Sequence, residues 1–385
     1  MNNKANRLLA SLMLSLGLIL TVPICLSACI PGPLTPVPTV TATARPTPPT
    51  AVLAPSEARG PIPGLEPCST YAVYYGPLDA ATLASLKVFD LVILHPGFDI
   101  TPAQVAELQA ASVIVLGYVS IGEEPSGTPQ TGDGLGPVHY DPAATCAGVP
   151  NRRCENKGVA SYYLDETVAA TALPGHDMLA DTVSQWNGLY VDLASEAWRN
   201  TVRFCGTTKT DCKFHGTDYV INTLGADGLF LDTVDAASPW FSYAYTLEAM
   251  ANFIGAISSW YPNDKAIVMN RGIFFADPQY MADLVRPHVN GVVFENYMTV
   301  WDWDKREARL SPYFADNRAN WAPKLVTQAM RPDGYTVFAL DYFTPTQQIS
   351  ITNQISETVE RLGWLDYIAN PTLDTVREEV RGYCN

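Results

Sequence analysis

The chain has 385 residues, of which 47% are hydrophobic and 16% charged, and its formal net charge is −15. A field this negative repels nucleic acid, so we expect no nucleic-acid partner. It favours a cationic ligand or polymer, although acidity can also serve only to keep an exported protein soluble.

The N-terminus has the layout of a secretory signal, with Lys4 and Arg7 ahead of an apolar run over 8–22. Residues 26–29 (LSAC) resemble a bacterial lipobox, so 1–29 is predicted to be a lipoprotein signal peptide with Cys29 as the lipidation site. The alternative is a plain signal peptide with an incidental cysteine. We therefore expect an exported, membrane-anchored protein that faces the cell exterior or the periplasm.

Residues 30–66 are dense in Pro, Thr and Ala and show neither a helical nor a strand period. Such a segment cannot bury enough apolar surface to offset its ordering entropy, which predicts an extended tether. The folded part, 67–385, then begins near Cys68 and has a suitable length for one α/β barrel.

Six cysteines remain once Cys25 is removed with the signal and Cys29 is lipidated. An even number in an exported chain suggests three disulfides. Closeness in sequence favours two of the pairs, and the third would join the ends of the domain. The expected pairs are Cys146–Cys154, Cys205–Cys212 and Cys68–Cys384. No metal site is expected, because no CxxC occurs and the five histidines are scattered.

Eight short apolar runs, separated by stretches with helical spacing, predict repeated βα units with buried parallel strands. The runs are 71–76 (YAVYYG), 90–96 (DLVILHP), 113–121 (VIVLGYVSI), 188–193 (GLYVDL), 228–235 (GLFLDTVD), 266–272 (AIVMNRG), 291–297 (GVVFENY) and 336–343 (TVFALDYF). Helices are predicted over 101–111, 195–204, 246–261, 278–287 and 348–362.

Eight strands alternating with helices indicate an α/β fold, a single-domain (β/α)₈ TIM barrel, more than an open sheet. No GxGxxG, GxxxxGK[ST] or GxSxG motif is present to support a doubly wound or hydrolase-type sheet. The stretch 122–176 interrupts the pattern and is rich in Gly, Pro and Thr. We interpret it as a long insertion after strand 3 that forms a lid.

Active sites of such barrels lie at the carboxyl ends of the strands, where polar residues follow apolar runs. Asp232 and Glu295 each follow such a run, on predicted strands five and seven, and a buried carboxylate needs a partner or a task. Two acids on nearby strands match the requirement of glycoside hydrolysis. The alternative is that each caps a helix or pairs with Arg271.

Further polar and aromatic residues near the same strand ends are predicted to bind substrate. Sugar rings stack on aromatic side chains, although Trp301 and Trp303 could instead be ordinary packing. The predicted substrate-binding residues are Tyr75, Glu123, Asp192, Asp235, Asn270, Arg271, Asn296, Trp301 and Tyr342.

Over nearly all of the folded part, the chain resembles glycoside hydrolase family 114, the endo-α-1,4-polygalactosaminidase-like barrels. The segments that carry the resemblance are 75–76, 89–93, 117–123, 191–192, 228–235, 270–272, 294–296 and 365–369, of which 117–123 (GYVSIGE) and 228–235 are the most specific. The resemblance implies Asp232 as nucleophile and Glu295 as general acid/base in a retaining mechanism. The long 122–176 insertion departs from the family pattern, which puts the number of subsites and the identity of the polymer in doubt.

The resemblance further implies an endo-acting hydrolase for a galactosamine-containing exopolysaccharide that is cationic when not acetylated. We expect a monomer without cofactor. Two alternatives stay open. One is a surface glycan-binding lipoprotein whose barrel has lost activity, and the other is a glycosidase for a neutral α-linked sugar, which the salt dependence of binding would distinguish.

Overall fold

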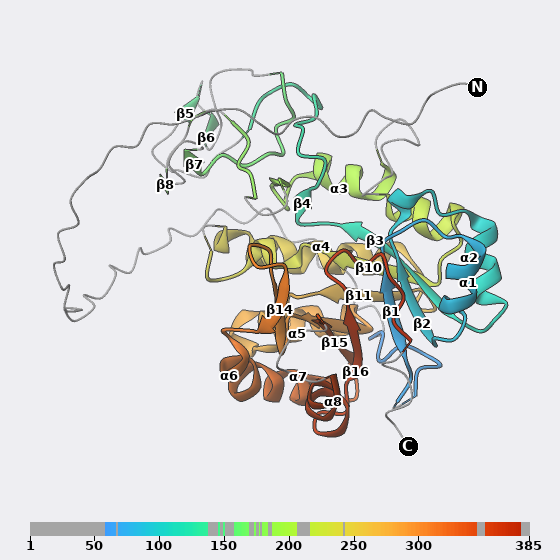
Figure 1. Ribbon diagram of the computed structural model, residues 1–385. Helices are drawn as coiled ribbons and strands as arrows, with labels where there is room; N and C mark the ends of the chain where they lie inside the picture. The colour runs from blue at the N-terminus through green and yellow to red at the C-terminus, as the bar shows by residue number, and fades with distance from the viewer. Residues whose placement is uncertain are drawn as a thin grey trace, which may run out of the picture. The chain divides into compact units, whose positions relative to one another are not determined.

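Runs of Val, Ile, Leu and Phe become the parallel strands at the centre of the fold, seen here in a computed structural model. Eight of these strands form one sheet in the order β1-β2-β3-β10-β11-β12-β15-β16 (Figure 1). The structure describes residues 58–66, 68–137, 145–146, 149–150, 158–168, 173–174, 177, 179–183, 187–205, 216–241, 243–344 and 351–378.

All neighbours in this sheet are parallel, and the sheet curls into a nearly closed (β/α)₈ barrel, which confirms the predicted fold class. The first and last strands lie side by side, with the rings of Tyr71 and Tyr367 5.8 Å apart. The strands are β1 (Tyr71–Tyr74), β2 (Leu91–Leu94), β3 (Ile114–Ser120), β10 (Gly228–Asp232), β11 (Ala266–Asn270), β12 (Gly291–Glu295), β15 (Thr336–Tyr342) and β16 (Leu365–Ala369).

One predicted barrel strand is wrong. Within 188–193, the two-residue strand β9 (Leu189–Tyr190) pairs antiparallel with β4 (Glu123–Glu124), outside the barrel. The eighth barrel strand is β16 instead, which the predicted set omitted. Asp232 and Glu295 therefore end the fourth and sixth strands of the barrel, not the fifth and seventh.

Helices follow most strands, and their starts obey the sequence signals. Thr101 caps α2 with a complete capping box and Pro at the first turn, and Ser195 caps α3. The helix predicted over 278–287 is broken, because Met281 adopts a left-handed conformation. The helices are α1 (Ala80–Leu86), α2 (Pro102–Gln109), α3 (Glu196–Phe204), α4 (Leu247–Trp260), α5 (Ala282–Val285), α6 (Phe314–Asp316), α7 (Ala322–Ala329) and α8 (Ile351–Ile355).

Alternation along each strand divides the buried residues into two layers. Phe230 and Val293 belong to a cluster that fills the barrel interior, whereas Leu229 and Leu231 pack in a cluster with the surrounding helices. A polar residue at a strand end faces the same layer as the residue two positions before it, because successive side chains point to opposite faces. Asp232, two residues after Phe230, faces the interior.

The predicted insertion does begin after β3, and its base is tied to the barrel. Trp198 of α3 is fully buried and donates its indole N–H to the carbonyl of Ile121, at 2.8 Å. Asp181 accepts hydrogen bonds from Thr167 and Tyr243. The other hairpins are β5 (Thr145–Cys146) with β6 (Val149–Pro150), β7 (Thr167–Val168) with β8 (Leu173–Pro174), and β13 (Thr299–Asp302) with β14 (Glu307–Leu310).

Packing also extends to the N-terminal side of Cys68, where the folded part was expected to begin. Arg59 is 8% exposed and donates to the carbonyls of Ser258, Tyr261 and Lys265, between the end of α4 and the start of β11. Residues 58–66 are thus part of the fold and not of a tether. The predicted signal, Cys29 and residues 30–57 lie outside the described residues.

The cysteines are only partly described. Cys68 and Cys205 are disulfide-bonded. The side chains of Cys146, Cys154, Cys212 and Cys384 lie outside the described residues, so the three pairings stay predictions.

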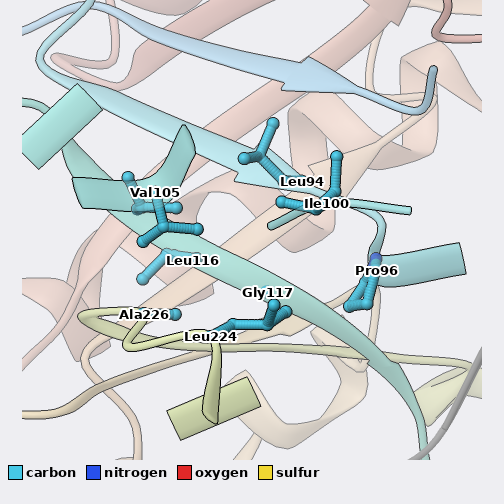
Figure 2. A pocket seen from close by; sticks show the side chains of 9 residues that line it. Leu94, Pro96, Ile100, Val105, Leu116, Gly117, Leu224 and Ala226 are labelled. Atoms are coloured by element: carbon cyan, nitrogen blue, oxygen red, sulfur yellow. The ribbon is translucent and has the colours of Figure 1, made fainter. Parts of the chain in front are cut away.

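A small cavity lies where β2 and β3 meet α2, and only apolar residues and glycine line it (Figure 2). It includes none of the predicted site residues and offers no group for chemistry. Within the described ranges, no helix has the length and apolar character needed to cross a membrane.

Candidate active site

Three adjacent strands of the barrel end in polar residues that meet at its carboxyl end. Asp232, Asn270 and Glu295 are the last residues of β10, β11 and β12. Since the alternation along these strands turns all three side chains to the interior layer, the two predicted catalytic acids flank one amide.

The amide of Asn270 bridges the two carboxylates. Its Nδ2 donates to Oδ1 of Asp232 and to Oε2 of Glu295, at 2.8 Å in both cases. The two oxygens therefore lie at most twice 2.8 Å, about 5.6 Å, apart. This contact places Asn270 between the two acids, and its predicted role in substrate binding stays a prediction.

Two tyrosines supply the other hydrogen bonds to the acids. Tyr342, at the end of β15, donates its hydroxyl to Oε1 of Glu295 at 2.7 Å. Tyr118, within β3, hydrogen-bonds to Asp232. Tyr118 was not among the predicted site residues because it sits inside an apolar run, although it shares a strand face with Ser120 at period two.

An aromatic wall adjoins these tyrosines. The imidazole of His95 stacks on Tyr118 with ring centroids 4.4 Å apart, and Tyr75 meets both rings edge-on, at 5.2 Å and 5.4 Å. Burial raises the pKa of Tyr75 well above its usual value, and Asp232 and Glu295 add to the effect. The predicted site residue Tyr75 is thus close to both acids and neutral.

The electrostatic environment separates Asp232 from an ordinary surface carboxylate. Burial, with Glu295 nearby, raises the pKa of Asp232 to about 6, while the hydrogen bond from Asn270 opposes the shift. Asp232 is therefore ionised at neutral pH but titrates in a range that is useful for catalysis.

The residue after each of these three strand ends has a left-handed backbone. Thr233, Arg271 and Asn296 have φ of 61°, 60° and 62°. This conformation is uncommon outside glycine and is costly for a β-branched residue such as Thr233. The hydroxyl of Thr233 accepts a hydrogen bond from the N–H of Gly122, so the turn also holds the segment that carries Glu123.

A second acidic group lies beside the pair. Arg271 forms a 3.0 Å ion pair with Asp235, and Glu123 of β4 is 7% exposed. Burial, then Asp235 and Asp232, raise the pKa of Glu123 to about 8, and Arg271 opposes the rise. The structure thus brings Glu123, Asp235 and Arg271 together with the predicted catalytic acids.

The remaining predicted residues are placed differently. Asp192 is not at the end of a barrel strand, because 188–193 is not one, and it accepts the N–H of Ala194 in a turn before α3. Asn296 has a buried Oδ1 without a partner among the described residues. Trp301 is partly buried on β13, where it packs against the interior cluster and meets the exposed Trp303 at 6.3 Å.

In the part of the chain that the structure describes, no group of three or more His, Cys, Asp or Glu side chains is arranged to hold a metal ion. The acids of the site are instead bonded to an amide, tyrosines and a guanidinium.

These features define a (β/α)₈ barrel with a bridged carboxylate pair at the carboxyl end of its strands. No family model and no curated protein sequence matches the chain. The solved structures that match include the glycoside hydrolase domain of PelA from Pseudomonas aeruginosa and a variant of that domain. Each is 21% identical and covers 80% of this chain and 97% of its own, with TM-scores of 0.50 and 0.51. This similarity establishes the barrel fold.

Proposed function

We propose that the protein is a glycoside hydrolase that cleaves an α-1,4-linked galactosamine-containing exopolysaccharide within the chain and with retention of configuration. Asp232 is the nucleophile and Glu295 the general acid/base. The family 114 resemblance in the sequence and the shared fold with the PelA domain both support this proposal.

The observation that carries the proposal is the bridged pair. Retaining glycosidases place their two carboxyl groups about 5–5.5 Å apart, whereas inverting enzymes leave about 6.5–9.5 Å for a water molecule. The amide of Asn270 holds one oxygen of Asp232 within about 5.6 Å of one oxygen of Glu295. The geometry therefore favours direct attack by a carboxylate.

In the first step, Asp232 attacks the anomeric carbon while Glu295 protonates the departing glycosidic oxygen, so that a glycosyl ester forms and the C–O bond breaks. In the second step, Glu295 takes a proton from water, and the water oxygen displaces Asp232 from the anomeric carbon. Asn270 donates to both carboxylates, and Tyr342 also donates to Glu295, so both acids stay aligned throughout.

The charge of the site supports an amino-sugar substrate. Four carboxyl groups interact with one guanidinium, that of Arg271, and they belong to Asp232, Glu295, Glu123 and Asp235. A substrate with protonated amines would complement this surplus of acid, and a neutral sugar would not.

Product analysis tests the proposal. The domain from Ala58 onward is incubated with purified α-1,4-galactosaminogalactan-type polymer, and released oligosaccharides are followed by mass spectrometry and anomers by NMR. We expect oligosaccharides of retained configuration from the wild type. Asp232→Asn and Glu295→Gln should each release at least about 10³-fold less. Binding without cleavage by the wild type would instead identify a glycan-binding protein.

A further inference from the structure

Glu123 is a buried carboxylate that the proposed two-step chemistry leaves without a task. It is 7% exposed, and no hydrogen bond from a described residue reaches its carboxylate. Its neighbour Glu124, also buried, accepts hydrogen bonds from the N–H and the hydroxyl of Ser126. Burying a carboxylate is costly unless it has a hydrogen-bond or ion-pair partner. Ser126 is such a partner for Glu124, whereas Glu123 still needs one.

The surroundings of Glu123 indicate that its missing partner is a cation. Tyr190 stands opposite it in the β4–β9 pair, and Asp235 and Asp232 lie close enough to raise its pKa. A cation bound beside Glu123 would oppose this effect and favour the ionised carboxylate, as Arg271 does in part. That guanidinium is already paired with Asp235 at 3.0 Å.

The residue just before β9 is a glycine, which leaves room for this carboxylate. A Cβ atom on Gly188 would lie only 2.7 Å from Oε2 of Glu123, so any side chain there would displace it. A second acceptor is also unused, since the buried Oδ1 of Asn270 has no partner among the described residues while its Nδ2 serves both catalytic acids.

We propose that Glu123 is the specificity-determining residue of the site, which binds a protonated amino group of the substrate and so selects the free amine over its acetylated form. This inference rests on the proposed function. It assigns the choice of acetylation state to the β4–β9 pair at the base of the insertion and not to the catalytic pair.

The test compares hydrolysis of fully de-N-acetylated and fully N-acetylated α-1,4-galactosaminan. Glu123→Gln keeps the shape but cannot ionise when the amine binds, so kcat/KM should fall about 10- to 100-fold on the free-amine polymer and less than about threefold on the acetylated one. Gly188→Ala should shift selectivity in the same direction. Glu124→Gln is the matched control and should leave the ratio unchanged.

Equal losses on both polymers, or none, would overturn the role of Glu123. If the wild type cleaves neither polymer, the proposed function fails. The role of Glu123 is then tested by ligand binding alone. In that case, calorimetric titration with galactosamine should show weaker binding to Glu123→Gln than to the wild type. Equal affinity, or no binding to either protein, would reject the cation site.

Discussion

Two pairs of acids lie on strands of the barrel wall, and their side chains face opposite sides of it. Asp232 and Glu295 end strands β10 and β12 and face the interior, where an amide and two tyrosines form hydrogen bonds with them. Asp341 and Asp366, on the neighbouring strands β15 and β16, share one strand face with Ala339 of the outer, helix-facing layer.

The partners of the outer pair are structural. Oδ1 of Asp341 accepts the backbone N–H groups of Met298 and Thr299, which start the β13–β14 hairpin. Asp366 accepts the hydroxyl of Thr358, next to α8. Each retains one buried oxygen without a partner among the described residues. The comparison teaches that position near the end of a strand does not distinguish the two pairs, and that the face of the strand does.

The largest expected difference appears when each pair is neutralised. Asp232→Asn should lower kcat at least about 10³-fold but leave the free energy of unfolding equal or higher, because a neutral amide avoids the desolvation that raises the pKa of Asp232. Parallel kinetics and urea unfolding of the purified domain measure both effects.

Asp341→Ala should show the reverse pattern. It leaves two buried N–H groups unpaired, so the free energy of unfolding should fall by about 2–4 kcal/mol, while kcat at low temperature falls less than about tenfold. If Asp341→Ala abolishes activity in a protein that is still folded by circular dichroism, the division between the two faces is wrong.

A smaller effect sharpens the role of Asn270 within the inner pair. Asn270→Ala removes one donor from each acid, so kcat should drop about 10- to 100-fold with KM nearly unchanged. Steady-state kinetics separate this from the role in substrate binding that the sequence suggested, which predicts a raised KM and an unchanged kcat.

The smallest effect concerns pH and the outer pair. Burial is the main cause that raises the pKa of Asp341 to about 8 and of Asp366 to about 7, above the usual value of about 4. The native state thus binds these protons more tightly than the unfolded chain. Their contribution to stability is complete below about pH 4 and is lost as the pH rises through 7 and 8.

Differential scanning calorimetry between pH 5 and 9 checks this dependence, with Tm expected to move by about 2–4 °C for each kcal/mol. Asp341→Asn cannot ionise, so it should show a flatter profile than the wild type. A profile as steep as that of the wild type would assign the dependence to other groups.

Much of the site could be predicted because a polar residue that ends an apolar run is visible in the sequence. That rule found Asp232, Glu295 and Tyr342. It could not find the bridge made by Asn270, since the direction of an amide depends on tertiary packing. Nor could it find Tyr118, whose phenol is hidden within an apolar run.

The error in the strand count has a similar physical origin. Residues 188–193 (GLYVDL) have the composition of a barrel strand, and only pairing with β4 shows where they belong. The left-handed turn at Thr233 opposes the local preference of a β-branched residue, so no sequence rule predicts it. Register and strain are decided by long-range contacts.

The contacts of Arg59 show at which end of the barrel the described chain begins. Its partners precede β11, and Asn290, just ahead of β12, donates to the carbonyl of Gly60, so this segment lies at the end of the barrel opposite Asp232 and Glu295. The described part of the chain therefore begins at the amino end of the barrel strands. Residues 59 and 60 are therefore remote from the candidate active site, and we expect substitutions there to change the stability of the barrel and not the geometry of the two acids.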